Sequence, residues 1–342
     1  METTDKKQKV TIRTVARDAG VSVAAVSKVL RNAYGVSDPL RQKVLASIDR
    51  LDYRPSTAAR GMRGRIYTIG LLVVRIGQPL IPDLIDSVSD VLGTENIQTL
   101  IGSGRSEPRL ETQLIASMAD FHMDGLILIA PRVDEDILGP FARKMPMVVI
   151  GHHEPEASTF DTVNCDDFTG ARLAIEALIA RGHKRIHMLS LAEQPGTESD
   201  VFRKREAGYT VAMTAAGLAD EIHIARATSH VYANHEDIHI AELLQQEPRP
   251  TAVFCWSDIH AVPLLNAAWL KGIRVPEDLS IIGYDNSAIA QQPIIGLSSV
   301  DQQPRTLGET AANLLLERME NRTEPRHILV APHLVLRRSV AH

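Results

Sequence analysis

The stretch that decides the fold is VTIRTVARDAGVSVAAVSKVL, residues 10–30. Two short segments with apolar residues at helical spacing meet at Gly20, and Ser22 stands where its hydroxyl can cap the second segment. Glycine permits the tight turn between the two segments. This pattern is typical of a helix-turn-helix, with helices expected over about Ile12–Ala19 and Val23–Leu30.

The second of these helices has one face free to read DNA. Val26, Val29 and Leu30 are expected to face inward, which leaves the opposite side of the helix start exposed. A third helix, capped by Ser37 and running to about Leu51, closes a three-helix core in this prediction. Its inward residues are expected to be Leu40, Val44, Leu45, Ile48 and Leu51. The predicted DNA-contacting residues of this unit are Thr11, Ser22, Val23, Ala24, Ser27, Lys28 and Arg31.

The charge distribution supports a nucleic-acid partner for this unit alone. Residues 1–65 hold 14 Lys and Arg against 6 Asp and Glu, whereas the rest of the chain holds 23 against 36. A basic head on an acidic body indicates a DNA-binding module carried by a body that does not bind DNA. The segment YRPSTAARGMRGR, residues 53–65, adds four arginines and two glycines, and we expect it to become helical only on DNA. The alternative is a plain charged linker.

Composition and motifs exclude several other classes of protein. The chain has no long apolar stretch and no signal peptide at its start, so we expect a cytoplasmic protein without a membrane span. Cys165 and Cys255 have no CxxC or Cys/His spacing, which argues against a disulfide framework and a zinc site. Phosphate loops, dinucleotide fingerprints and nucleophile elbows are also missing from the sequence, so no enzyme activity and no cofactor are predicted.

From Ile66 onward apolar runs alternate with amphipathic helical stretches, which is typical of βαβ units with a parallel sheet. The pattern occurs twice, so we predict an α/β core of two doubly wound parallel-sheet lobes with a ligand cleft at the strand ends. The predicted boundaries are a helix-turn-helix domain at 1–53, a hinge at 54–65 and a core at 66–342. Within the core the first lobe is expected over about 66–163 and 295–325, and the second over about 164–294 and 326–342.

Several segments in register resemble the LacI family of transcription regulators. These are VTIRTVARDAGVSVAAVSKVL, VSDPLRQKVLASIDRLDYRPSTAARGMR, GHKRIHMLSL, RKREAGY, GIRVPEDLSIIGYDNS and HLVLRRS. The resemblance covers nearly the whole chain. It implies a homodimer with a helix-turn-helix headpiece, a hinge helix and a two-lobed core like that of periplasmic sugar-binding proteins. The function it implies is a repressor of palindromic operator DNA that a small metabolite controls.

The resemblance assigns roles to individual headpiece and hinge residues. Val23, Ala24 and Lys28 match the base-reading positions, and only Lys28 carries a hydrogen-bond donor. In the hinge, Ala59 and Met62 match the positions that enter the minor groove, with Ser56 as the expected cap. The family usually has Leu where this chain has Met62. More of the sequence preference is therefore expected from the hinge and from DNA shape.

The resemblance also assigns an effector site. Arg205 matches a ligand-binding arginine, and Asp285 and Asn286 match the polar pair at the cleft floor; an Arg opposite an Asp suits the hydroxyls of a sugar. The predicted effector-binding residues are Arg75, Arg105, Arg205, Ser257, Asp258, Asp285, Asn286 and Gln302. Ser257 departs from the family, which often has Asn there.

Two of these residues are arginines whose positions bear on the charge of the effector. Arg75 and Arg105 follow the first two core strands, where ligands bind in such sheets. If both face the cleft with Arg205, the effector is expected to be a sugar acid or a phosphorylated sugar rather than a neutral sugar. His152 and His153 are expected near the cleft rim, where solvated histidines are an equal alternative.

Two other functions fit only part of the sequence. A sugar-binding transport component fits the core but not the basic headpiece or the missing signal peptide. An enzyme with an appended DNA-binding domain lacks any catalytic motif. The sequence ends at RRSVAH without a heptad tail, so a dimer is expected rather than a tetramer.

Overall fold

The computed structural model describes residues 10–30, 34–54, 65–191, 200–227 and 238–341, and the chain divides into two compact units, Met1–Ile66 and Tyr67–His342. The described part of the first unit contains the helices α1 (Ile12–Asp18), α2 (Val23–Leu30) and α3 (Asp38–Arg50). All three begin within a residue of the predicted positions.

Local capping explains where the first two helices begin. The Thr11 hydroxyl accepts a hydrogen bond from the backbone N–H of Thr14, whose own hydroxyl accepts from the backbone N–H of Thr11. At α2 the Ser22 hydroxyl accepts from the N–H of Ala25 at 3.1 Å. Between the helices Gly20 has φ +57°, a conformation that glycine adopts without strain. These contacts fix the angle between α1 and α2 through a short turn.

A small apolar core holds the three helices together. Its buried members are Val15, Ala16, Ala19, Val26, Val29 and Val44. One prediction for α3 is wrong, because Leu45 is 45% exposed and points away from this core. The buried Ser47 hydroxyl instead donates to Asp18 Oδ2 at 2.5 Å, and Asp18 also pairs with Arg50. The contact between α1 and α3 is therefore partly polar.

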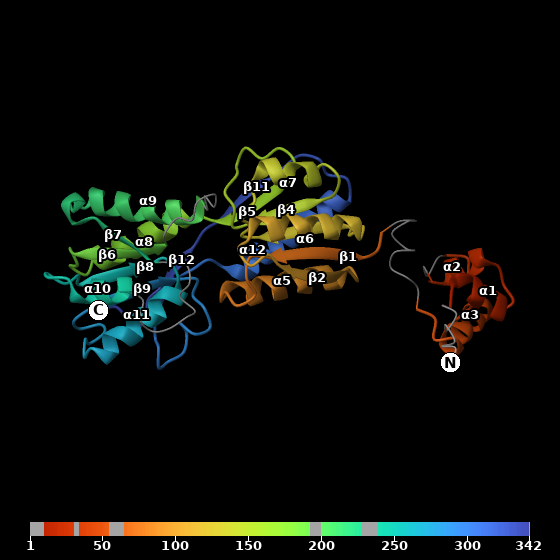
Figure 1. Cartoon of the computed structure of the whole chain (residues 1–342), viewed down its shortest axis with the longest axis horizontal. Coiled ribbons are helices and arrows are strands. Elements are labelled where there is room, and N and C mark those ends of the chain that lie inside the picture. Colours follow the sequence, from red (N-terminus) through yellow and green to blue (C-terminus); the bar gives the residue numbers. More distant parts are fainter. Residues whose placement is uncertain (1–9, 31–33, 55–64, 192–199, 228–237, 342) are drawn as a thin grey trace, which may run out of the picture. The chain divides into compact units, whose positions relative to one another are not determined.

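The second unit contains two six-stranded sheets in the described residues (Figure 1). The first sheet has the order β11-β5-β4-β3-β1-β2, and all its pairs are parallel. Its strands are β1 (Thr68–Val73), β2 (Gln98–Ser103), β3 (Gly125–Ile129), β4 (Met147–Ile150), β5 (Asp161–Cys165) and β11 (His327–Val330). Its helices are α5 (Leu80–Thr94), α6 (Pro108–Asp120), α7 (Glu135–Ala142) and α12 (Pro304–Met319).

The second sheet has the order β12-β10-β9-β8-β6-β7, in which only the edge strand β12 runs antiparallel. Its strands are β6 (Ile186–Leu191), β7 (His223–Ala227), β8 (Ala252–Cys255), β9 (Ser280–Tyr284), β10 (Ser298–Asp301) and β12 (His333–Val335). Its helices are α8 (Asp167–Ile179), α9 (Asp200–Ala215), α10 (Ile238–Gln245) and α11 (Asp258–Leu270), with a short 3-10 turn at Ala219–Glu221.

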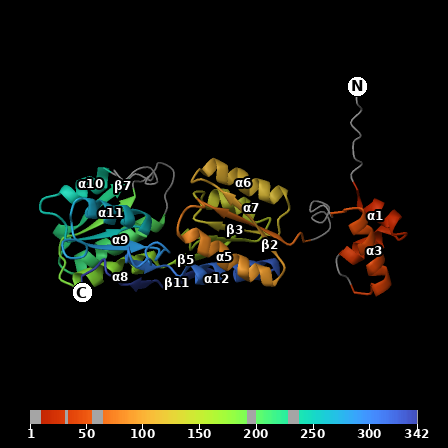
Figure 2. The same ribbon diagram turned by 90° about the horizontal axis from the view of Figure 1, so that it is seen from below.

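Helices cover both faces of each sheet, which explains the continuous apolar runs of the inner strands. In the second lobe, alternate strand residues divide between two clusters: Met188 and Phe254 face α8 and α9, whereas Leu189 and Val253 face α10 and α11. In the first lobe, α5 and α12 pack together against one face of the sheet (Figure 2). The predicted α/β core of two doubly wound lobes is confirmed.

The chain crosses between the lobes at places that differ from the prediction. Residues 298–301 were expected in the first lobe, but β10 pairs with β9 of the second sheet. Residues 327–330 were expected in the second lobe, but β11 pairs with β5 of the first sheet. Backbone pairing with these distant strands therefore sets the crossings after Cys165, Asp301 and Val330.

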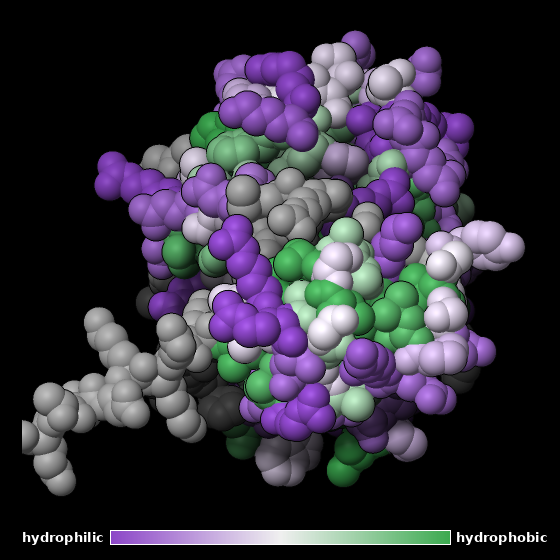
Figure 3. Space-filling view, turned by 90° about the vertical axis from the view of Figure 1, so that its right-hand side faces the viewer, coloured by the Kyte–Doolittle hydropathy of each residue, from purple (hydrophilic) through white to green (hydrophobic). Residues whose placement is uncertain are grey.

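The surface seen in Figure 3 is mostly hydrophilic around a smaller hydrophobic area. Large apolar side chains that are at least 45% exposed in the second unit are Tyr67, Ile76, Leu100, Ile101, Phe121, Val211, Trp269, Leu270, Ile289, Ile294 and Leu329. Among the described helices, none is long and apolar enough to cross a membrane. Cys165 and Cys255 are buried thiols that form no disulfide.

Candidate effector cavity and DNA-binding surface

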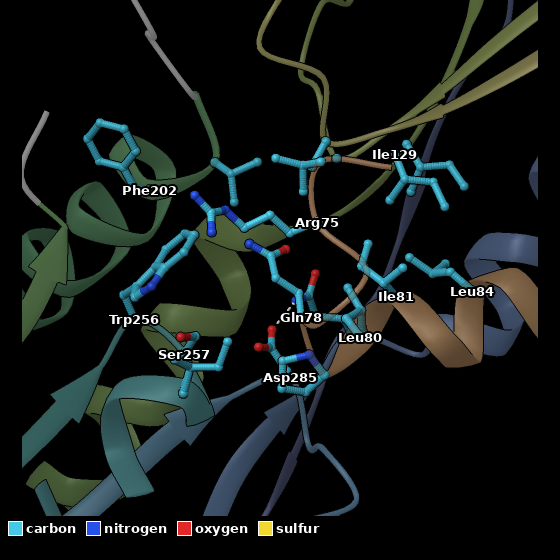
Figure 4. A pocket seen from close by; sticks show the side chains of 18 of the residues that line it. Arg75, Gln78, Leu80, Ile81, Leu84, Ile129, Phe202, Trp256, Ser257 and Asp285 are labelled. Atoms are coloured by element: carbon cyan, nitrogen blue, oxygen red, sulfur yellow. Dashed lines mark hydrogen bonds between the residues drawn. The ribbon is translucent and has the colours of Figure 1, made fainter. Parts of the chain in front are cut away.

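A cavity of about 420 Å³ lies between the two lobes of the second unit, at the carboxyl ends of strands from both sheets (Figure 4). The first lobe contributes the turns after β1, β2 and β3 and the start of α5. The second lobe contributes the first half of α9, the turns after β8 and β9 and the start of α11. A cavity of this size suits a small metabolite.

Arg205 on α9 is the most firmly held side chain of the cavity. Its Nε donates to Asp167 Oδ1 at 2.7 Å and its Nη1 donates to the carbonyl of Trp256 at 2.6 Å. The guanidinium also lies over the ring of Tyr284, 3.6 Å from the centroid. Burial opposes both charges of the ion pair, but each partner favours the charged form of the other. The pKa of Asp167 is lowered and that of Arg205 is raised.

Asp285, directly after β9, is the second buried carboxyl of the cavity. Its Oδ1 accepts a hydrogen bond from Gln302 Nε2 at 2.5 Å, and Gln302 follows β10 on the neighbouring strand. Burial raises the pKa of Asp285 to about 8; Arg205 opposes this shift and the Asp258 carboxylate adds to it. Burial thus favours the protonated form of Asp285, in which the carboxyl can donate as well as accept a hydrogen bond.

Aromatic side chains line the second-lobe wall. Trp256 and Phe202 face the cavity, and Figure 4 shows Arg75 pointing from the first lobe toward their side. The Trp256 Nε1 atom is buried and has no hydrogen-bond partner among the described residues. A flat apolar wall with one unused donor suits the ring of a sugar, whose hydroxyls lie at its rim and whose C–H groups lie on its faces.

Three arginines come from the first lobe. Arg75, Arg105 and Arg132 follow β1, β2 and β3, which are neighbours in the order β3-β1-β2. Arg75 Nε lies 3.4 Å from the Ser106 hydroxyl. The fully buried Glu111 accepts a hydrogen bond from the backbone N–H of Arg132 at 2.6 Å, which holds the turn after β3 in place.

Six of the eight predicted effector residues line the cavity: Arg75, Arg105, Arg205, Ser257, Asp285 and Gln302. The other two, Asp258 and Asn286, are not among its lining residues and stabilise the second lobe instead. Asp258 accepts from the N–H and hydroxyl of Ser287 and from the hydroxyl of Ser299. Asn286 contacts Asp301 and Arg337. Their side-chain polar atoms therefore form hydrogen bonds within the second lobe.

The two histidines expected at the rim are not lining residues either. His152 Nε2 lies 2.6 Å from Glu154, and the buried His153 lies 3.0 Å from Asp167 Oδ2. His153 thus extends the Arg205–Asp167 pair to the loop that follows β4.

Sequence reasoning missed several polar and aromatic lining residues, namely Gln78, Glu107, Arg132, Asp167, Phe202, Trp256 and His260. Arg132, Asp167 and Trp256 each come within three residues of a strand end. The same rule that selected Arg75 and Arg105 would have found them.

The candidate DNA-binding surface is the start of α2. Lys28 and Ala24 are exposed and Val23 and Ser27 are partly exposed, as predicted, while Val26 and Val29 are buried. The hydroxyls of Thr11 and Ser22 are used as helix caps and remain at the surface. Four further candidates, Arg31, Ser56, Ala59 and Met62, lie outside the described residues.

Both units of the chain are similar to known protein families. The model of the bacterial regulatory proteins of the lacI family matches residues 11–56, and that of the periplasmic binding protein-like domain matches residues 175–340. The HTH-type transcriptional repressor PurR of Erwinia tasmaniensis is 34% identical over 340 residues, 97% of each chain.

Two solved structures show the same fold. A complex of the transcriptional regulator CelR with cellobiose is 27% identical, covers 96% of this chain and 99% of that one, and has a TM-score of 0.69. The lac repressor dimer bound to operator and the anti-inducer ONPF is 22% identical, covers 98% and 100%, and has a TM-score of 0.83.

Proposed function

This chain belongs to the lacI family of bacterial regulatory proteins and is a DNA-binding transcriptional repressor regulated by a small-molecule effector, and from that premise we propose what it binds and how it switches. It acts as a cytoplasmic homodimer on palindromic operator DNA, and its effector is a sugar or sugar derivative held between the lobes. The observation that carries this proposal is the cavity in which Arg205, Asp285 and Gln302 lie close to an aromatic wall.

The polar groups of the second lobe suit adjacent hydroxyls. Arg205 uses Nε and Nη1 within the protein, and its Nη2 has no protein partner in the part of the chain that the structure describes. Gln302 and the protonated Asp285 supply an amide and a carboxyl nearby. A vicinal diol can accept from Arg205 Nη2 and exchange hydrogen bonds with Asp285, while a C–H face of the ring packs on Trp256. The CelR structure, which holds cellobiose, supports this class of ligand.

Switching requires the effector to prefer one arrangement of the lobes. Both lobes line the cavity, so a bound molecule contacts both of them. It connects the turns that follow β1, β2 and β3 in the first lobe with α9 and the turn after β9 in the second lobe. A differential affinity of 1–3 kcal/mol between two lobe arrangements changes operator affinity about 5–150-fold. Induction and corepression use the same contacts. Whether the effector lowers or raises operator affinity is therefore measured in the operator-binding experiment.

The second copy of the chain is proposed to cover exposed apolar residues of the core. Leu100 and Ile101, on the edge strand β2, are 53% and 47% exposed. An unpaired edge with large apolar side chains favours association. Leu100→Glu should therefore convert a dimer to a monomer in sedimentation experiments, whereas Leu45→Glu in the headpiece should not. A wild-type chain that sediments as a monomer at micromolar concentration would contradict the homodimer.

Operator selection tests the proposal as a whole. We expect the full chain to enrich two-fold symmetric sites from random duplex DNA, and fluorescence anisotropy to show affinity at least 10³-fold above that for unrelated DNA. Addition of the cognate sugar derivative should shift that affinity within the range given above. Enrichment of single, unpaired half-sites, or the same affinity for all DNA, would refute a symmetric operator.

A further inference from the structure

We infer that the effector is an anion, and that Arg75, Arg105 and Arg132 bind its carboxylate or phosphate group while the Arg205 side of the cavity takes its neutral part. This inference rests on the proposed function only in using the same cavity. In this arrangement the first lobe binds the acidic group of the effector and the second lobe binds its hydroxyl groups.

Strand register brings the three arginines together. In the first sheet Val73 of β1 pairs with Ser103 of β2 on one side and with Ile129 of β3 on the other, so the three strands end at one level. Each arginine comes two or three residues later, after Val73, Ser103 and Ile129 respectively. Neighbouring strands lie about 4.8 Å apart, so three guanidinium groups start from adjacent points on one wall.

The turns after β2 and β3 contain residues with an unusual backbone conformation. Arg105 and Ser106 have φ values of 53° and 60°, and Ala130 has 51°, a left-handed conformation that is costly for residues with a side chain. Such outliers after β2 and β3 bend the chain sharply at the cavity. The Glu111 carboxylate, through its bond to the N–H of Arg132, holds the second of these turns.

The described lining residues of the cavity carry more basic than acidic side chains. Its charged lining residues are Arg75, Arg105, Arg132, Arg205, Glu107, Asp167 and Asp285. Asp167 forms an ion pair with Arg205, and burial raises the pKa of Asp285 and so favours its neutral form. Arg75, Arg105 and Glu107 are exposed and Arg132 is partly buried, and none of the three arginines forms an ion pair among the described residues.

Arg132 is the most buried of the three arginines. Burial lowers the pKa of Arg132, the Glu111 carboxylate opposes this effect, and the charge of Arg75 adds to it. An anion that the partly buried Arg132 and the exposed Arg75 can both reach offsets the repulsion between the two guanidinium groups. Planar guanidinium groups bind carboxylate and phosphate oxygens in pairs, so either group fits this subsite.

Inorganic phosphate tests the subsite without knowledge of the effector. The melting temperature of the full chain is measured against phosphate, with chloride at equal ionic strength as the reference. We expect a saturable rise of a few degrees in the wild type, and at least a tenfold higher phosphate requirement in Arg75→Gln and Arg132→Gln. Arg109→Gln, an exposed arginine outside the cavity, should behave as the wild type. The absence of a rise, or an equal rise in every variant, would overturn the inference.

Matched ligand series then separate carboxylate from phosphate. Ribose, ribonate and ribose 5-phosphate, and the corresponding glucose series, are compared by calorimetry and by their effect on operator binding. We expect an acidic member to bind at least tenfold more tightly than its neutral parent, with the difference lost in Arg132→Gln. A neutral sugar that binds as tightly and shifts operator affinity overturns the anionic effector but leaves the proposed function standing. Tight binding of an acidic member that leaves operator affinity unchanged supports the subsite and contradicts its role as effector.

Discussion

Replacement of Arg205 by alanine should destabilise the core strongly, because Arg205 joins several elements of the second lobe. Its side chain and that of Asp167 are each only 3% exposed, and their atoms lie 2.7 Å apart. Arg205→Ala leaves the buried Asp167 carboxylate with His153 as its remaining side-chain hydrogen-bond partner among the described residues, and it removes a hydrogen bond to the Trp256 carbonyl. Breaking a buried ion pair from one side costs about 3–5 kcal/mol, a large share of the ~5–15 kcal/mol that stabilises a typical protein.

Urea unfolding followed by tryptophan fluorescence measures this loss. The chain has two tryptophans, and Trp256 lies 4.8 Å from the Arg205 guanidinium whereas Trp269 is 73% exposed. The signal change therefore reports mainly on the cavity. Arg172→Ala is the matched control, because its ion pair with Glu176 on α8 is solvent-exposed and contributes about 0–1 kcal/mol.

A double-mutant cycle decides whether the ion pair is the cause. Asp167→Asn combined with Arg205→Ala should cost at least 1 kcal/mol less than the sum of the two single changes. A loss below about 1 kcal/mol in Arg205→Ala, or additive losses in the cycle, would refute the reasoning. Arg205→Lys keeps the positive charge but not the planar guanidinium group. Comparison of its stability and its effector affinity with those of Arg205→Ala therefore separates the role of Arg205 in folding from its role in effector binding.

Three further predictions concern DNA reading, pH and helix packing. Lys28→Ala should weaken operator binding by about 1–3 kcal/mol and alter sequence preference in anisotropy titrations, whereas an equal loss on all DNA would indicate a phosphate contact. Because burial raises the pKa of Asp285 to about 8, the folded chain holds a proton that the unfolded chain has released, and stability should fall as pH rises from about 4 to about 8. Urea midpoints across that range should show a smaller slope in Asp285→Asn, and an unchanged slope would contradict the assignment. Gly208→Ala should destabilise by about 1–3 kcal/mol because its Cβ would meet the Phe168 carbonyl, whereas Gly93→Ala, with open space around it, should stabilise by about 0.5–1 kcal/mol; equal effects would contradict the packing.

The headpiece was predictable because local interactions form it. Gly20 and the caps at Thr11 and Ser22 act within three or four residues, so the sequence contains both partners of each contact. The failure at Leu45 has a similar origin. Leu45 follows Val44 directly and precedes Ile48 by three positions, so helical spacing alone does not separate it from the buried Val44.

The cavity was predictable only in part, because its side chains are sorted by contacts between distant segments. The strand-end rule correctly placed Arg75 and Arg105 at the cavity wall. The family resemblance did not distinguish Asp285, which lines the cavity, from Asp258, whose carboxylate accepts hydrogen bonds from two serines. The hydroxyls that decide this are 29 and 41 positions away in the chain. The crossings after β10 and β11 were misplaced for the same reason, because each strand is assigned by a partner far away in sequence.

The places at which the chain crosses between the lobes have a consequence for folding during synthesis. The first sheet receives its last strand, β11, and one of its covering helices, α12, only after nearly the whole second lobe has been made. A nascent chain that ends before residue 304 therefore exposes the apolar face that Leu307, Ala311 and Leu315 later cover. The headpiece, whose contacts are local, can fold as soon as it leaves the ribosome. We expect the ribosome-bound chain to hold a folded DNA-binding unit beside an unfinished core, which is the stage at which chaperones are needed.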